Sequence, residues 1–292
     1  MIAIMTGGEI AAAALAGKVV THAGKELAEE SKSIRKELLD QAKQTPEFEK
    51  AARSYATRLA LRQELLTSMY KPIAKMLGVA NKYFDNDFET EMAEKLSDVP
   101  EEHIVAPKAS LAAPAMQHLG FSLDEPDLKE LYLSLLATAS DARQPNAAHP
   151  SFVEVIKQLS AEELPFLEQV LKQPGRSTPA IRVVMAQEGV EGTKQLTAHL
   201  VELTPANTKA AAAQMVGPYI DNWCRLGLIT ADYESWLVDP KAYSWVEESV
   251  IYRAIKGRVE GPGRTVTFKR GMLVSTDFGR AFGLAVGILT GR

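Results

Sequence analysis

The side chains best suited to chemistry lie near the carboxyl terminus, and they are basic. Residues 251–292 hold eight Lys or Arg and two Asp or Glu, although the whole chain has a formal net charge of −4. Five of these residues are candidate anion or nucleic-acid contacts: Lys256, Arg258, Arg264, Lys269 and Arg270. Cations at a hairpin tip can contact phosphate oxygens. The same charges can instead hold this segment against the acidic remainder of the chain.

The glycine-rich loop GRVEGPGR, residues 257–264, is a second candidate for anion binding. Arg258 and Arg264 stand near its ends, and its three glycines give the backbone freedom to surround a phosphate. A plain surface loop ahead of a hairpin explains the same composition. The chain has neither GxGxxG nor GxxxxGK[ST], so we expect no nucleotide cofactor.

Catalytic and metal-binding patterns are missing from the sequence. The five histidines are far apart and form no HxH or HExxH pattern: His22, His103, His118, His149 and His199. Paired glutamates are adjacent in sequence and would diverge by about 100° on a helix, as solvated caps do: 29–30, 101–102, 162–163 and 247–248. Cys224 is the only cysteine, and we expect a buried, inert thiol. We therefore expect no catalytic, cofactor-binding or metal-binding residues, and no enzyme.

Three short helices are expected between Asp127 and Leu171. Apolar residues recur at helical spacing from Leu128 to Ala139, from Phe152 to Leu159 and from Leu164 to Leu171. Ser122 with Glu125, and Ser160 with Glu163, have the spacing of capping boxes, and Pro150 suits a helix start. The two leading stripes should bury four side chains together: Leu131, Leu135, Phe152 and Ile156.

Two pairs of segments, one within these helices and one after them, resemble the Abi-alpha ("abortive infection alpha") family, a domain of unknown function. They are LYLSLLATASD followed by HPSFVEVIKQLSAEELPFL, and NWCRLGLI followed by TVTFKRGMLVSTDFGRAF. The resemblance spans roughly Ile73 to Leu284. It implies a bacterial protein connected with resistance to phage, and it brings no catalytic residue with it.

The amino-terminal region is expected to form long charged helices. Thr6 and Glu9 have capping-box spacing, and residues 7–44 are rich in strong helix formers. A second helix should follow Pro46 and continue to about Tyr70. The apolar run from Ile10 to Ala16 is too short to span a bilayer or to direct export. These helices should pack on each other or mediate self-association.

The carboxyl-terminal region is expected to resemble a winged helix. Residues 193–201 and 206–215 are interpreted as short helices, and Val216 to Cys224 as another, closed by Gly227. Alternation over 265–268 and 272–274, with a turn at Arg270-Gly271, predicts a hairpin. Thr276 should cap a last helix bearing Gly279, Gly283 and Gly287. The helix expected to read DNA offers only Arg225, which disfavours sequence-specific binding.

Together these patterns predict a mainly α fold with a small α+β winged-helix-like carboxyl-terminal module. We expect a long-helix region over 1–105, a central helical domain over 106–173 and the winged-helix-like domain over 174–292. Length, a 46% apolar composition and one cysteine fit a globular protein of the cytoplasm. The predicted function is phage defence through contacts with a protein partner or a second copy. The alternative is a nucleic-acid-binding regulator that uses the basic hairpin.

Overall fold

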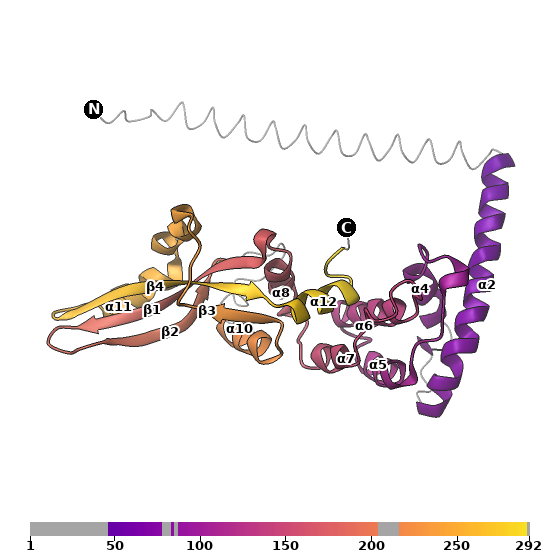
Figure 1. Ribbon diagram of the computed structural model, residues 1–292, viewed down its shortest axis with the longest axis horizontal. Helices are drawn as coiled ribbons and strands as arrows, with labels where there is room; N and C mark the ends of the chain where they lie inside the picture. The colour runs from indigo at the N-terminus through magenta and orange to yellow at the C-terminus, as the bar shows by residue number, and fades with distance from the viewer. Residues whose placement is uncertain (1–45, 78–82, 85–86, 204–215, 291–292) are drawn as a thin grey trace. The chain divides into compact units, whose positions relative to one another are not determined.

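The computed structural model describes residues 46–77, 83–84, 87–203 and 216–290. The chain divides into two compact units, Met1–Arg62 and Gln63–Arg292. Helix α2, Pro46–Leu77, begins in the first unit and ends in the second (Figure 1), which confirms the expected helix after Pro46. The helix expected over 7–44 and the one expected over 206–215 lie outside the described residues. In the described part of the chain, no helix is long and apolar enough to cross a membrane.

The first half of the second unit is helical (Figure 1). Its helices are α4 Phe88–Lys95, α5 Ala109–Phe121, α6 Pro126–Ala139, α7 Ser151–Ile156 and α8 Leu164–Leu171, with a short 3-10 turn at Glu101–His103. Leu131, Leu135, Phe152 and Ile156 are all at most 4% exposed, as their spacing predicted. The three predicted helices therefore form because each buries its apolar stripe.

The part of α2 in this unit is fixed to the helices around it by one buried tyrosine. The Tyr70 hydroxyl lies 2.7 Å from the Ser140 hydroxyl at the end of α6, and its ring meets Phe88 edge-on at 5.2 Å. Gln63 also donates to the Thr90 hydroxyl of α4 at 3.1 Å. Pro72 lies inside α2 and does not end it.

The predicted capping boxes form only in part. Ser122 ends α5, where its hydroxyl donates to the His118 carbonyl at 3.1 Å, and α6 begins with Pro126. That predicted box is wrong because a proline at the first helical position supplies the start without a side-chain cap. At α8 the Glu163 carboxylate does accept from the Ser160 backbone N–H at 2.7 Å, which is half of the expected box.

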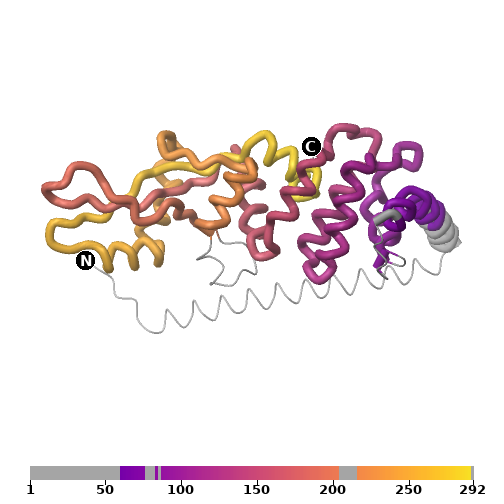
Figure 2. Tube along the Cα trace, turned by 90° about the horizontal axis from the view of Figure 1, so that it is seen from below, coloured from indigo at the N-terminus to yellow at the C-terminus, as the bar shows by residue number. Residues whose placement is uncertain are grey.

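The second half of the unit contains a four-stranded antiparallel sheet with strand order β2-β1-β4-β3. Its strands are β1 Ser177–Gln187, β2 Thr193–Val201, β3 Ile229–Asp232 and β4 Arg264–Ser275. Figure 2 shows the β1–β2 turn and the turn before β4 at the same end of the sheet. The mainly α, winged-helix prediction is therefore wrong, and the fold combines helices with a substantial sheet.

Two misread segments account for this error. Residues 193–201 form a strand rather than a helix, because they pair with β1. The predicted hairpin is one continuous strand, since β4 pairs with β1 from Arg264 opposite Gln187 to Val274 opposite Ser177. Gly271 does not turn the chain. It is glycine because a Cβ there would overlap the Tyr233 ring and the Asp232 carbonyl oxygen.

One face of the sheet is covered by the 3-10 helix η3 Pro240–Glu248 and the helix α11 Val250–Val259. Ile181, Val183, Leu200 and Val266 pack there against Tyr243, Val246 and Tyr252. We call this the apolar face. Helix α10, Val216–Arg225, packs along β2 and β3 instead.

The sheet joins the helices through the ends of α10 and α12, Asp277–Ala285. Gly227 closes α10 with φ +74° and the Leu228 N–H bonds the Trp223 carbonyl at 2.9 Å, as predicted. Thr276 caps α12, also as predicted, by accepting from the Gly279 N–H at 2.8 Å. A Cβ on Gly279 would overlap the Leu228 backbone, so glycine allows this close approach. The Thr138 hydroxyl of α6 donates to the Ala285 carbonyl at 2.8 Å.

Candidate functional site

The face of the sheet opposite the apolar face carries a cluster of polar side chains from five elements. Its members are Arg182 of β1, His199 of β2, Asp221 of α10, Tyr233 just after β3, and Lys269 of β4. We call these five residues the sheet-face cluster. Strand pairing places these residues, which are far apart in sequence, beside one another. The sheet-face cluster is therefore the candidate functional site.

A hydrogen-bonded chain runs from Asp221 through His199 to Tyr233. The His199 Nδ1 lies 2.7 Å from the Tyr233 hydroxyl, and Nε2 lies 3.2 Å from Asp221 Oδ1. All three groups are satisfied if Tyr233 donates to Nδ1 and the Nε2–H donates to Asp221. Burial lowers the pKa of His199, against the opposing influence of Asp221, so the neutral ring that this arrangement needs is favoured.

Arg182 stacks on the same tyrosine. Its guanidinium carbon lies 4.1 Å from the centre of the Tyr233 ring, within the range of a cation–π contact. The Arg182 Nε is buried and has no hydrogen-bond partner. In the antiparallel register Arg182 stands directly opposite Lys269, so the two cations share this face of the sheet.

Two possible nucleophiles lie in this region, the Tyr233 hydroxyl and the Cys224 thiol. Burial raises the pKa of the Tyr233 hydroxyl and that of the nearby Cys224 thiol, so neither is ionised near neutral pH. Among the described residues no group of three or more His, Cys, Asp or Glu could hold a metal ion. The arrangement can position charge and donate hydrogen bonds.

The five predicted anion contacts do not gather at one hairpin tip. Lys269 belongs to the sheet-face cluster, whereas Arg270 faces the other way, 5.4 Å from the Tyr243 ring centre. Lys256 lies 5.8 Å from the ring centre of Tyr252, and Arg258 is exposed on α11. The opposite orientations of Lys269 and Arg270 follow from a continuous β4, in which successive side chains point to opposite faces.

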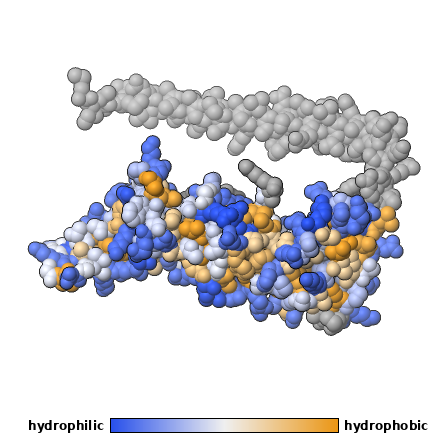
Figure 3. Space-filling view, viewed as in Figure 1, coloured by the Kyte–Doolittle hydropathy of each residue, from blue (hydrophilic) through white to orange (hydrophobic). Residues whose placement is uncertain are grey.

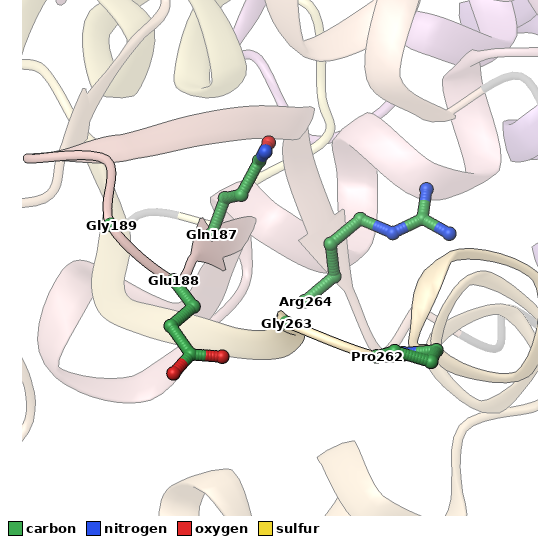
Figure 4. A pocket seen from close by; sticks show the side chains of 6 residues that line it. All are labelled: Gln187, Glu188, Gly189, Pro262, Gly263 and Arg264. Atoms are coloured by element: carbon green, nitrogen blue, oxygen red, sulfur yellow. The ribbon is translucent and has the colours of Figure 1, made fainter.

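Arg264 lies at the end of the sheet, beside the turn between β1 and β2. It lines an open depression of about 660 Å³ together with Gln187, Glu188, Gly189, Pro262 and Gly263 (Figure 4). The Glu188 N–H donates to the Gly263 carbonyl at 2.7 Å, which holds the two turns together. Figure 4 shows the side chains of Glu188 and Arg264 pointing in different directions. The loop predicted over 257–264 is helical as far as Val259, so Arg258 lies on α11 and does not line this depression. The charged residues that line it are Glu188 and Arg264, one of each sign, which makes it a poor cradle for phosphate.

An apolar pocket of about 420 Å³ lies among the start of α5, the end of α6 and the loop before α7. Two of its polar lining residues, Asp141 and His149, bond to neighbouring residues. Asp141, 4% exposed, forms an ion pair with Arg143 at 2.7 Å, and this hydrogen-bonded partner lowers the pKa of the carboxyl group. His149 accepts from the Ser151 N–H at the start of α7, at 3.2 Å.

Sequence reasoning missed most of the cluster, and it misjudged one glutamate. Glu163 is not a solvated cap but is 3% exposed, and its second oxygen accepts from Trp223 Nε1 at 2.7 Å. Nothing local distinguishes Arg182, His199, Asp221 or Tyr233, since each is a single polar residue in its own element. Only the strand pairing brings them together, and β2 had been interpreted as a helix.

Comparison with known proteins gives one informative match. A family model described as "Abortive infection alpha" matches residues 80–286. No curated protein matches the chain. An uncharacterized protein from the hydrocarbon-degrading marine bacterium Alcanivorax borkumensis SK2 is 14% identical, with 50% of this chain and 96% of that one covered and a TM-score of 0.31. Similarity at that level carries no argument about fold or function.

Proposed function

We propose that this chain, which belongs to the abortive infection alpha family, takes part in the defence of a bacterium against phage. The observation that carries the proposal is the family match over residues 80–286, which includes both the helices and the sheet. The proposed place of action is the cytoplasm, because a single cysteine in 292 residues suits a reducing compartment.

The proposed mechanism is contact with another macromolecule rather than catalysis. The pKa of Tyr233 and that of Cys224 are raised by burial, which is the opposite of what a nucleophile needs. Large apolar side chains are exposed before η3 and at the start of α11, with Val238 at 93%, Val250 at 77% and Trp236 at 55%. Figure 3 shows apolar surface interspersed with hydrophilic surface on the visible face of the second unit. Exposed apolar groups of this size suit a protein partner or a second copy.

The direct experiment is a phage challenge of bacteria that express the full chain. We expect fewer plaques than with an empty vector for at least one phage of a diverse panel. Replacing Trp236 and Val238 by Ser should abolish protection without lowering the melting temperature, because both side chains are exposed. The matched control is Phe121→Ser, a 79% exposed apolar residue at the end of α5, which should protect like the wild type. Equal plaque counts with vector and wild type across the panel would reject the proposal.

Nucleic-acid binding is the second candidate, and the favouring observation is the pairing of Arg182 with Lys269 across two strands. It does not involve a winged-helix hairpin, since β4 is a single strand. A mobility-shift assay with the purified chain at low and moderate salt separates this candidate from the first. Binding that disappears as salt rises supports it, because phosphate contacts release counterions.

A further inference from the structure

We propose that Arg182 and Lys269 form a binding site for a phosphate group on the sheet face that carries Tyr233. The inference is independent of phage defence, since it rests on the geometry of three strands. It concerns a site between β1 and β4, whereas the basic hairpin expected from the sequence placed its cations at a tip.

The first argument is that two positive charges lie side by side without a negative partner in the described part of the chain. Directly opposed residues on antiparallel strands have Cβ atoms about 5 Å apart, and like charges in that position repel. Arg182 and Lys269 are such a pair. Over the described residues neither of them forms an ion pair with a carboxylate. An anion bound between them would remove this repulsion, and Asp221, the carboxylate of the sheet-face cluster, pairs with His199 instead.

The second argument is that one of the two cations is held in place. The Tyr233 ring stacks on the Arg182 guanidinium, and the Tyr233 hydroxyl is in turn fixed by His199 and Asp221. Gly271 leaves the room that the ring occupies against β4. A preorganised guanidinium loses little freedom when it binds an oxyanion, so this support favours binding.

The third argument concerns the chemistry of the ligand. A guanidinium offers several donors in one plane and an ammonium adds three more, which suits the several oxygens of a phosphate. Thr267 lies two residues before Lys269 on the same strand, is exposed, and therefore presents its hydroxyl on the same face. The phosphate can belong to a small molecule or to a polynucleotide backbone, because both present the same oxygens.

The test is a titration of the full chain, at about 50 mM salt where phosphate contacts are strongest, with three probes. They are inorganic phosphate, a nucleoside triphosphate, and a labelled single-stranded oligonucleotide of about ten nucleotides. We expect Lys269→Gln to weaken binding about tenfold or more, since it removes a charge-assisted hydrogen bond. Lys269 is exposed, so this variant should keep the wild-type melting temperature. Arg182→Gln should weaken binding at least as much.

The control is Lys157→Gln, which removes the same charge just after α7, where Lys157 pairs with Glu154 at 3.4 Å. It should bind like the wild type. Much tighter binding of the oligonucleotide, with a salt dependence that drops by about one unit in Lys269→Gln, identifies a polynucleotide as the source. Comparable binding of all three probes identifies a small phosphate ligand. The proposal is overturned if no probe binds the wild type, or if Lys269→Gln binds as tightly as Lys157→Gln.

Discussion

Glu163 shows how one residue can connect the two kinds of structure in the second unit. Its carboxylate is 3% exposed and accepts from the Ser160 N–H and from Trp223 Nε1, each at 2.7 Å. Ser160 precedes α8 and Trp223 belongs to α10, so one buried carboxylate joins a helix of the first half to a helix beside the sheet. A buried charge is tolerated only when its hydrogen bonds are made, and here both oxygens are engaged.

Replacing Glu163 by Gln should therefore destabilise the protein by about 1.5–3 kcal/mol. The amide keeps the shape of the side chain but presents an N–H₂ group to one of two N–H donors, which leaves that donor unpaired. Urea unfolding monitored by circular dichroism measures the change. Trp223→Phe removes the indole N–H that donates to Glu163, and it provides the second arm of a double-mutant cycle. Additive effects of the two substitutions would show that the contact does not form.

Asp141 gives a prediction about pH. Arg143 lowers the pKa of this carboxyl group in the folded state, so its stabilising effect is present above the unfolded pKa of about 3.9 and is lost as pH falls through the lower folded value. Asp141→Asn should cost about 1–2 kcal/mol at pH 7 and make stability depend less on pH in the acid range. Denaturant unfolding between pH 7 and pH 2 measures both effects. Asp277, whose side chain is 96% exposed, pairs with Arg176, so Asp277→Asn should change little, and an equal effect at both sites would contradict this account.

At the scale of elements, the helices α6 and α7 were predictable from sequence because each buries a clear amphipathic stripe. The spacing of Leu131 with Leu135 and of Phe152 with Ile156 is a local signal, and the structure buries all four. Strands were less predictable, because β2 and β4 are stabilised by pairing with β1, which no short window of sequence contains. Arg270-Gly271 has the composition of a turn. In the folded chain its glycine instead makes room for Tyr233.

Leu135→Ala tests the core of the helical half. Leu135 is fully buried in α6, and its removal should cost about 2–5 kcal/mol if the neighbouring side chains cannot close the cavity. The melting temperature and the urea midpoint report the loss. The control is Leu65→Ala on α2, where the side chain is 38% exposed and the loss should be smaller. An unchanged midpoint for Leu135→Ala would mean that this stripe is not buried.

Gly271→Ala tests whether β4 is continuous. A Cβ at this position would overlap the Tyr233 ring and the Asp232 carbonyl oxygen, so we expect a loss of about 1–3 kcal/mol from overpacking. A turn at this position would not produce that clash. The control is Gly257→Ala on α11, where nothing lies within 4 Å of the added carbon and helix propensity predicts a small gain. Equal stability of the two variants would argue against the continuous strand.

For the whole molecule, the sequence predicted the family and the helices, but not the site. The segments LYLSLLATASD and TVTFKRGMLVSTDFGRAF suffice for the family because order and spacing survive without any knowledge of pairing. The sheet-face cluster can be recognised only when the register of β1, β2 and β4 is known. The interpretation of the basic segment 251–292 depends on the same register. Within this segment Lys269 and Arg270 point to opposite faces of the sheet, whereas Lys256 and Arg258 lie on α11. The predicted domain boundaries at residues 105 and 173 stay a prediction.

The most direct test of a non-catalytic role in defence is a phage challenge of cells that express His199→Gln together with Tyr233→Phe. These changes remove the hydrogen-bonded chain from Asp221 to Tyr233 but keep the tyrosine ring that supports Arg182. The measurement is the number of plaques and the phage yield per infected cell, relative to wild type and empty vector. Our account predicts wild-type protection by the double variant. Protection lost in the double variant, at unchanged expression and melting temperature, would contradict it and show that the hydrogen-bonded chain from Asp221 to Tyr233 takes part in defence.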